Sequence, residues 1–290
     1  MKYISMMSLL LLISCASAEK EEKEKQEPQP FYVGTYTDKE SQGIYKYELS
    51  EEGQMKQIGL MAATENPSFL AKSSDGRYLL AVNEISDENN NGRVESYAIS
   101  ADSLLLISRK SSGGAHPCFV SMNEEGYVLV ANYTGGNIAL LKIDEQGALK
   151  ELDLEPHEGK GTTSRQQGPH AHAAWFAPMN DHIISADLGS NELWFSTIEE
   201  EKLVPVTPQK IAMEPGAGPR HLCFHPRHQW FYVLNELNGT VTQVEVLADG
   251  SYQIQSTHST LDAEYTAENY AADIHISTDG RFLYASNRGP

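Results

Sequence analysis

A pattern that recurs about every fifty residues constrains this sequence more than any other feature. Each copy holds a turn, a short run of apolar or aromatic residues, and then an asparagine or an aspartate. Two clear copies are DGRYLLAVNE at 75–84 and DGRFLYASNR at 279–288. The polar residues that end the runs are Asn83, Asn132, Asp187, Asn235 and Asn287. Such copies predict repeated structural units that bury their apolar faces against one another.

Each unit is predicted to contain four short strands. An apolar run precedes the marked one, as in PCFVSMN at 117–123, and two more follow it, as in NIALLKID at 137–144 and LKELDLE at 149–155. Four strands per repeat are typical of a β-propeller blade. A β-solenoid or a string of hairpins is the alternative, but solenoid coils are shorter. The sequence stops inside its sixth unit, so we expect a fragment of about five and a half blades, because a propeller closes its ring.

The first residues are predicted to direct export. Lys2 precedes an apolar stretch, residues 6–13, that is too short to span a bilayer and leads into LISC, which ends at Cys15. LISC resembles a bacterial lipobox, whose cysteine is lipidated; an ordinary signal peptide cut near Ala16 or Ala18 is the alternative. We therefore assign 1–15 to a lipoprotein-type signal peptide, 16–30 to a charged flexible tether and 31–290 to the propeller. This predicts a periplasmic or cell-surface lipoprotein whose only membrane contact is its lipid anchor.

Charge and cysteine content narrow the partners. The chain has 40 Asp and Glu against 22 Lys and Arg, a net charge of -18, which argues against nucleic acid and against anionic membrane surfaces. Cys118 and Cys223 lie in apolar runs and are predicted to be buried thiols rather than a disulfide. His170 and His172 would share one face of a strand as a possible metal pair, but no third ligand is apparent. We predict no metal and no cofactor.

Charged residues bracket the paired strands. Arg220 and His221 start one apolar run, and Glu236 follows the next. In a hairpin the start of one strand lies beside the end of its antiparallel partner, so these residues should meet at one rim. Equivalent positions in other units hold His116, His172, Asp273, Glu84, Tyr133, Leu188 and Arg288. In a radial arrangement they converge on one mouth of the central channel, which is the default binding site.

Several motifs, taken together, carry a resemblance to a known family. They are YVGTYT, HPCFVSMN, GPHAH, GPRHLCFHP, VLNEL and ADIHISTDGRFLYASNRG. The sequence resembles the seven-bladed propeller lactonases, which include bacterial 6-phosphogluconolactonase and fungal carboxy-cis,cis-muconate cyclase, from about Phe31 to its end. The resemblance implies an all-β, seven-bladed propeller of four-stranded antiparallel blades. It also implies a monomeric hydrolase for a small-molecule lactone, nominally 6-phospho-D-glucono-1,5-lactone, with 6-phosphogluconate as the product.

The resemblance places four catalytic candidates on this chain. They are His172, Arg220, Glu236 and Arg288. Glu236 is the expected base that activates water, His172 the acid, and the arginines bind an anion or the developing oxyanion. Further candidates for substrate binding are His116, His170, His221, Glu84, Asn235 and Asn287. The loop that begins at Gly159 is predicted to form a wall or lid of the mouth.

Three alternatives stay open at this stage. Glu236 and Arg220 could form a simple ion pair without a catalytic role. The chain could be a non-catalytic, surface-tethered binding scaffold, because propellers serve many functions. It could also be a cyclase for a muconate-type carboxylate. Export argues against a phosphorylated substrate, so an unphosphorylated sugar lactone or another carboxylate-bearing lactone is expected.

Overall fold

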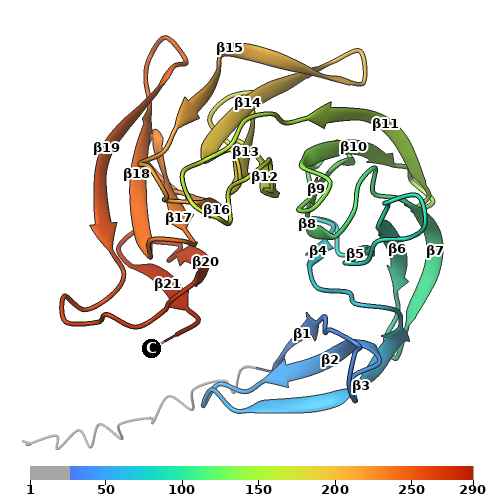
Figure 1. The fold of residues 1–290 in the computed structure, drawn as a ribbon. Coiled ribbons are helices and arrows are strands. Elements are labelled where there is room, and N and C mark those ends of the chain that lie inside the picture. The colour runs from blue at the N-terminus through green and yellow to red at the C-terminus, as the bar shows by residue number, and fades with distance from the viewer. Residues whose placement is uncertain (1–26, 290) are drawn as a thin grey trace, which may run out of the picture.

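The protein is a ring of β-sheets. A computed structural model describes residues 27–289, which contain 21 strands in six antiparallel sheets. Figure 1 shows these sheets standing around a common axis, as the blades of a propeller do. The predicted signal peptide, 1–15, and the predicted lipidation site Cys15 lie outside the described residues. Within residues 27–289 no helix is long and apolar enough to cross a membrane.

The strands follow the sequence repeat, and each sheet is one blade. Blade 1 has β1 (Gln29–Val33), β2 (Gly43–Leu49) and β3 (Met55–Ala63). Blade 2 has β4 (Leu70–Lys72), β5 (Tyr78–Asn83), β6 (Arg93–Ile99) and β7 (Leu104–Ser111). Blade 3 has β8 (Pro117–Met122), β9 (Tyr127–Asn132), β10 (Asn137–Ile143) and β11 (Leu149–Pro156). Blade 4 has β12 (Ala171–Phe176), β13 (Ile183–Asp187), β14 (Glu192–Glu199) and β15 (Lys202–Ala212). Blade 5 has β16 (Pro219–Phe224), β17 (Trp230–Asn235), β18 (Thr240–Val246) and β19 (Tyr252–Ser259), and blade 6 has β20 (Ala271–Ile276) and β21 (Leu283–Asn287).

The prediction of four-stranded antiparallel blades is confirmed by blades 2 to 5. Their first strands, β4, β8, β12 and β16, lie nearest the axis, and their fourth strands lie at the outside (Figure 1). β1 begins at Gln29, inside the segment predicted to be a tether, and pairs Gln29 with Leu49 and Pro30 with Glu48. The sheet therefore starts two residues before the predicted boundary at 31.

The core lies between the blades. Each of the five clusters of buried apolar side chains joins two neighbouring blades; Phe195 of blade 4, for example, packs in one cluster with Phe231 of blade 5. The middle strands are therefore covered on both faces, and β13 is buried along its whole length. This explains why the second strand of each repeat is a continuous apolar run rather than an alternating one.

The polar residues that mark the repeat end the second strands. Asn83, Asn132, Asp187, Asn235 and Asn287 are the last residues of β5, β9, β13, β17 and β21. The buried amide of Asn83 donates to Thr64 Oγ1 and to the carbonyl of Glu65, and that of Asn235 donates to Thr240 Oγ1 and Thr242 Oγ1. Asn83 thus binds the segment that leads into the inner strand β4, whereas Asn235 binds the third strand of its own blade.

A β-bulge recurs in the first strands. Pairing slips between Pro117 and Phe119, between Ala171 and Ala173, and between Pro219 and His221. The extra residues are Cys118, His172 and Arg220. A bulged residue has no partner opposite it in the ladder, and the bulge redirects its side chain. Ser68 has the same place before β4, since PSF there corresponds to PCF in β8. In blade 6 the slip extends from Ala271 to Ile274.

Candidate functional site

A cavity of about 230 Å³ opens at the inner ends of the blades. Most of its lining comes from two repeated positions. The bulge position supplies Ser68, Cys118, His172 and Arg220. The position directly after the marker residue supplies Glu84, Tyr133, Glu236 and Arg288, and Tyr36 has the corresponding place in blade 1, where Thr35 stands at the marker position. Phe69, Arg165 and His221 complete the wall. The predicted convergence of rim residues is thus present for Glu84, Tyr133, His172, Arg220, His221, Glu236 and Arg288. Three predicted rim residues do not line the cavity: Leu188, which follows the marker in blade 4, is fully buried, and His116 and Asp273 lie outside the wall.

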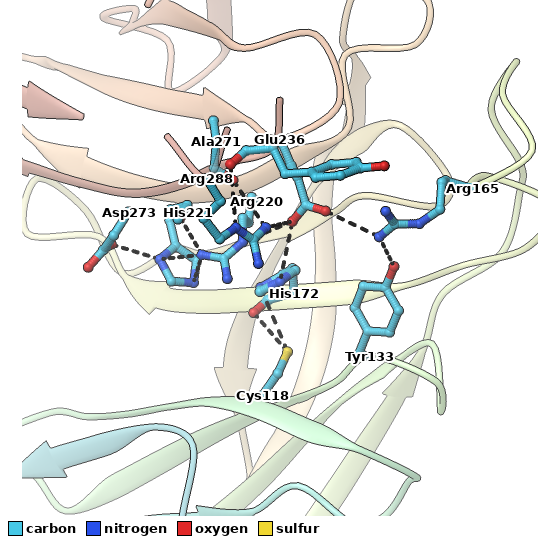
Figure 2. Close-up of polar contacts among 12 residues, drawn as sticks. Cys118, Tyr133, Arg165, His172, Arg220, His221, Glu236, Ala271, Asp273 and Arg288 are labelled. Carbon is cyan, nitrogen blue, oxygen red and sulfur yellow. Dashed lines mark hydrogen bonds and ion pairs between the residues drawn. The ribbon is translucent and has the colours of Figure 1, made fainter. Parts of the chain in front are cut away.

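Glu236 is the centre of the charge arrangement. Its side chain is only 5% exposed, and its two oxygens face three guanidinium groups. Oε2 accepts a hydrogen bond from Arg220 Nε at 3.0 Å and forms an ion pair with Arg288 Nη2, also at 3.0 Å, and Oε1 accepts a hydrogen bond from Arg165 Nη2 at 3.1 Å. Figure 2 shows Arg165 approaching the carboxylate from the side opposite to Arg220 and Arg288. Two of the roughly four lone-pair positions of the carboxylate therefore accept hydrogen bonds, and a third guanidinium lies within ion-pair distance.

Arg220 is the most deeply placed of the three arginines. Its side chain is 15% exposed, against 43% for Arg165 and 52% for Arg288. Nη1 donates to the carbonyl of Ala272 in blade 6, so the guanidinium bridges two blades. Burial lowers the pKa of Arg220, while the charge of Glu236 raises it. Removal of either partner would leave the other as a buried charge with less compensation.

His172 is buried beside this network. Its Nε2 lies 4.0 Å from Glu236 Oε2, and its Nδ1 lies 3.7 Å from the sulfur of Cys118. Burial, together with the positive charges of Arg220 and Arg288, holds the pKa of His172 well below its usual range. The imidazole is therefore neutral near pH 7. Cys118 and Cys223 are both free thiols, and burial raises the pKa of the Cys118 thiol.

A second hydrogen-bonded chain lies behind Arg220. His221 Nδ1 is 2.8 Å from Asp273 Oδ1, and His275 Nε2 is 2.9 Å from Asp273 Oδ2. Burial lowers the pKa of His221 to about 4, although the hydrogen bond with Asp273 raises it. The His221 ring also contacts the rings of Phe69 and Phe119 edge-on. His221 thus lines the cavity as a neutral ring held between blades.

Glu84 is the second carboxylate in the cavity wall, and its surroundings differ. It accepts a hydrogen bond from the hydroxyl of Tyr36 at 2.7 Å. No lysine or arginine within residues 27–289 forms an ion pair with it. Ser68 lines the same part of the cavity, and its hydroxyl is buried without a hydrogen-bond partner in the described part of the chain.

The remaining substrate-binding candidates lie beside the cavity rather than in its wall. His170 stacks on Tyr133, with ring centroids 4.5 Å apart, and its Nδ1 donates to the Tyr133 carbonyl at 3.0 Å. His116 has φ 51° and hydrogen-bonds Thr134. In blade 3 the bulge gives the cavity position to Cys118 instead of His116.

Asn235 and Asn287 do not line the cavity either. The amide of Asn235 bonds to two threonines of its own blade, and Asn287 Oδ1 accepts from Thr260 Oγ1 and Asn269 Nδ2. Their contacts fit the marker role described for the repeat. They support the cavity from behind, because the residues that follow them, Glu236 and Arg288, do line it.

Sequence reasoning missed Arg165 as a site residue. It correctly singled out the loop that begins at Gly159, but it did not choose among the loop residues. The available signal was charge: an anion or carboxylate site in so acidic a chain needs local arginines, and Arg165 is the single arginine between 159 and 172. Its Nη2 donates to the Tyr133 hydroxyl at 2.9 Å as well as to Glu236.

The described residues offer no evident place for a metal ion. Within residues 27–289 no group of three or more His, Cys, Asp or Glu side chains is arranged to hold one. The bulge at His172 breaks the alternation that would have put His170 and His172 on one strand face. His170 is stacked on Tyr133, whereas His172 faces the cavity.

The chain is similar to known proteins over most of its length. The profile of the family described as "Lactonase, 7-bladed beta-propeller" matches residues 30–290. A 6-phosphogluconolactonase of Bacillus subtilis is 33% identical over 264 residues, which are 89% of this chain and 74% of the relative. A 6-phosphogluconolactonase of Formosa agariphila is 32% identical over 269 residues, with 89% of this chain and 75% of the relative covered. The structure of the Pseudomonas aeruginosa periplasmic gluconolactonase PpgL is 30% identical, with a TM-score of 0.85, over 90% of this chain and 76% of that one.

Proposed function

The chain belongs to the seven-bladed β-propeller lactonase family, and from that premise we propose that it hydrolyses the cyclic ester of a sugar lactone to the open-chain sugar acid. The observation that supports this most directly is the position of Glu236. A buried carboxylate held by three guanidinium groups lies at the wall of a cavity large enough for a small sugar ring. Lactone hydrolysis needs both an acceptor for the proton of water and positive charge near the reacting carbonyl.

The reaction needs one proton acceptor and one oxyanion site. Water attacks the lactone carbonyl carbon, and its proton passes to Glu236. The carbonyl oxygen becomes an oxyanion, which the exposed donors of Arg288 and the neighbouring Arg220 stabilise. When the tetrahedral intermediate collapses, the bond from the carbonyl carbon to the ring oxygen breaks, and Glu236 returns the proton to that oxygen. The product carboxylic acid ionises in neutral solution.

His172 has a different role here from the one expected from sequence. Its lowered pKa leaves little imidazolium near pH 7, so it is a poor general acid in that range. One carboxyl group can carry both proton steps, as just described. We assign the neutral imidazole to hydrogen bonding with the attacking water or the substrate, from its place beside Glu236 Oε2. Arg220 then keeps the carboxylate oriented.

The names of the relatives suggest the substrate class. Two are called 6-phosphogluconolactonase, and one is called a periplasmic gluconolactonase. The predicted signal peptide at 1–15 would place this chain outside the inner membrane, where we propose that it acts on a sugar lactone or a carboxylate-bearing lactone. Lipid attachment at Cys15 is part of the same proposal. It is testable by metabolic labelling with a fatty acid and by Cys15→Ala.

A panel of lactones tests the activity. The purified chain is mixed with glucono-1,5-lactone, its 6-phosphate, and the lactone of an aldaric acid, and acid release is followed after subtraction of spontaneous hydrolysis. We expect turnover of at least one of them and its loss in Glu236→Gln. Absence of turnover on the whole panel, from protein shown to be folded, would reject the proposal and favour a binding scaffold.

A further inference from the structure

The loop that carries Arg165 is fastened at both ends by one carboxylate. At its start, His157 Nδ1 lies 2.8 Å from Asp187 Oδ2. At its end, the backbone N–H of His170 donates to Asp187 Oδ1 at 2.9 Å. The side chains of His157 and Asp187 are completely buried. Residues 157–170 thus form a compact loop whose two ends meet, and its base is held rigidly to blade 4.

The interior of the loop is organised around Gln166, which is fully buried. Its Oε1 accepts from the backbone N–H groups of Thr162 and Thr163, and its Nε2 donates to Asn191 Oδ1 at 2.9 Å. The neighbouring residue, Arg165, is therefore held at a fixed position on the loop surface. Its long side chain remains free to change direction, because 43% of it is exposed.

The two oxygens of Glu236 are not equivalent. Oε2 receives two guanidinium groups, from Arg220 and Arg288, and also lies nearest to His172. Oε1 receives only Arg165 among residues 27–289. If Glu236 takes a proton from water, Oε1 is the less encumbered oxygen, and Arg165 is the single group that has to leave it. Arg165 occupies the oxygen that the reaction needs.

We propose that Arg165 is a specificity-determining residue that transfers from Glu236 to an anionic substituent of the substrate. The inference rests on the proposed lactonase function and adds a substrate class, a lactone that carries a phosphate or a carboxylate. A guanidinium binds either anion through two parallel hydrogen bonds, so such a substituent competes well with a single shared donor. Binding of the anionic lactone frees Oε1 to accept the proton of water. A neutral lactone leaves the Arg165–Glu236 pair in place and reacts more slowly.

The geometry around Arg165 suits this exchange. Its guanidinium lies 5.6 Å from the ring centroid of Tyr270 and donates to the Tyr133 hydroxyl, so it is bordered by aromatic side chains at the mouth. Arg288, which is half-exposed and lines the same cavity, can supply a second positive charge to the anion. The acidic net charge of the chain would otherwise repel such a substrate.

Substitution of Arg165 tests the exchange with three substrates that differ in charge. Glucono-1,5-lactone is neutral, its 6-phosphate carries a phosphate, and an aldaric acid lactone carries a carboxylate. In Arg165→Gln we expect kcat on the neutral lactone to rise severalfold, and kcat/KM on the preferred anionic lactone to fall about tenfold or more. Arg165→Lys should keep part of the preference, because the charge remains. Comparison of the phosphate and carboxylate arms identifies which anion is recognised.

The matched control is Arg77→Gln. Arg77 is also exposed and paired with an acidic residue, Asp75, but it lies outside this cavity. Arg77→Gln should change neither kcat on the neutral lactone nor kcat/KM on the anionic lactone. A complementary measurement adds inorganic phosphate or acetate to the neutral lactone: the separate anion should accelerate the wild type and have no effect on Arg165→Gln.

An unchanged ratio of anionic to neutral kcat/KM in Arg165→Gln would overturn the proposal while leaving the lactonase function intact. If no lactone is turned over, a binding measurement still tests the role of Arg165 separately from the lactonase function. Calorimetry with gluconate and 6-phosphogluconate should show tighter binding of the phosphate by the wild type and loss of that difference in Arg165→Gln. Equal affinities in both proteins would reject the role of Arg165 independently of catalysis.

Discussion

Two glutamates at the same position of the repeat have opposite surroundings. Glu84 follows the marker Asn83, and Glu236 follows the marker Asn235. Glu236 contacts three guanidinium groups, whereas Glu84 contacts one hydroxyl, that of Tyr36. Both line one cavity. The repeat sets the position of each carboxylate, and the neighbouring side chains set its charge environment and therefore its chemistry.

The neighbours differ at matching positions. The bulge beside Glu236 supplies Arg220, and the corresponding position beside Glu84 is Ser68. The next blade supplies Arg288 to Glu236 and Tyr133 at the equivalent place after Glu84. Blade 5 thus surrounds its glutamate with guanidinium groups, and blade 2 surrounds its own with hydroxyl groups. Substitutions at matching positions of the two blades should therefore have different effects.

The largest difference is expected in catalysis. Glu236→Gln should lower kcat by about 10²–10⁴-fold, because the amide cannot accept the proton of water. Glu84→Gln should lower kcat less than about tenfold, since it removes only a possible contact to a substrate hydroxyl. Steady-state kinetics on the best lactone of the panel measures both. An equal loss in the two variants would show that the guanidinium cluster does not distinguish the carboxylates.

Substitutions at Arg220 and at the matching position in blade 2, Ser68, should differ in their effect on the free energy of unfolding. Arg220→Met should lower the free energy of unfolding by about 3 kcal/mol, because it leaves Glu236 buried with only its two half-exposed partners. Ser68→Ala should change it by less than about 0.5 kcal/mol, since that hydroxyl has no partner within residues 27–289 to lose. Urea denaturation followed by circular dichroism gives both values. A destabilised Ser68→Ala would contradict the comparison.

The residues that follow the bulges should differ in pH dependence. An unfolded histidine has a pKa of about 6.5. Burial lowers the pKa of His221 to about 4, so between these values the unfolded chain binds a proton that the folded chain does not. The contribution of neutral His221 to the free energy of unfolding is thus fully present above pH 6.5 and is lost as the pH falls towards 4. Phe69 has the equivalent place in blade 2, and His221→Phe should remove about 2 kcal/mol of this loss. Unfolding measured from pH 7.5 to 4.5 tests it, and an unchanged slope would contradict it.

The smallest difference in the free energy of unfolding and in KM is expected between substitutions of the marker residues Asn235 and Asn83. Asn235→Ala and Asn83→Ala should each lower the free energy of unfolding by about 1–2 kcal/mol, because each removes two buried hydrogen bonds. KM should change little in either, since neither amide lines the cavity. Thermal unfolding and lactone kinetics on the same samples separate the two effects. A large rise in KM for Asn235→Ala alone would restore its predicted role in substrate binding.

Much of the fold could be predicted because the repeat is regular. The period and the marker residues placed Glu84, Tyr133, Glu236 and Arg288 at one rim, and the cavity contains all four. Two rules justified that prediction: hairpin geometry decides which strand ends are adjacent within a blade, and the radial arrangement of the blades brings those ends to one rim.

What could not be predicted depends on single-residue shifts and on a loop. In blade 3 the cavity position falls on Cys118, the extra residue of the bulge, and not on His116 two residues earlier. Strand pairing at that end is needed to see this, although PCF at 117–119 does align with PSF at 67–69. Arg165 reaches Glu236 from a loop whose shape depends on the buried contacts of Asp187 and Gln166. The neutral state of His172 follows from burial beside Arg220, which sequence spacing does not reveal.

The recurrent bulge has a consequence for protein engineering. Because the extra residue in β8, β12 and β16 has no partner across the ladder, its side chain can be exchanged without disturbing strand register. Cys118 and His172 are therefore positions at which the cavity lining can be varied, whereas Arg220 also compensates the buried charge of Glu236 and should be kept. A combinatorial library at these codons would sample new ligand chemistries while the intervening scaffold stays constant.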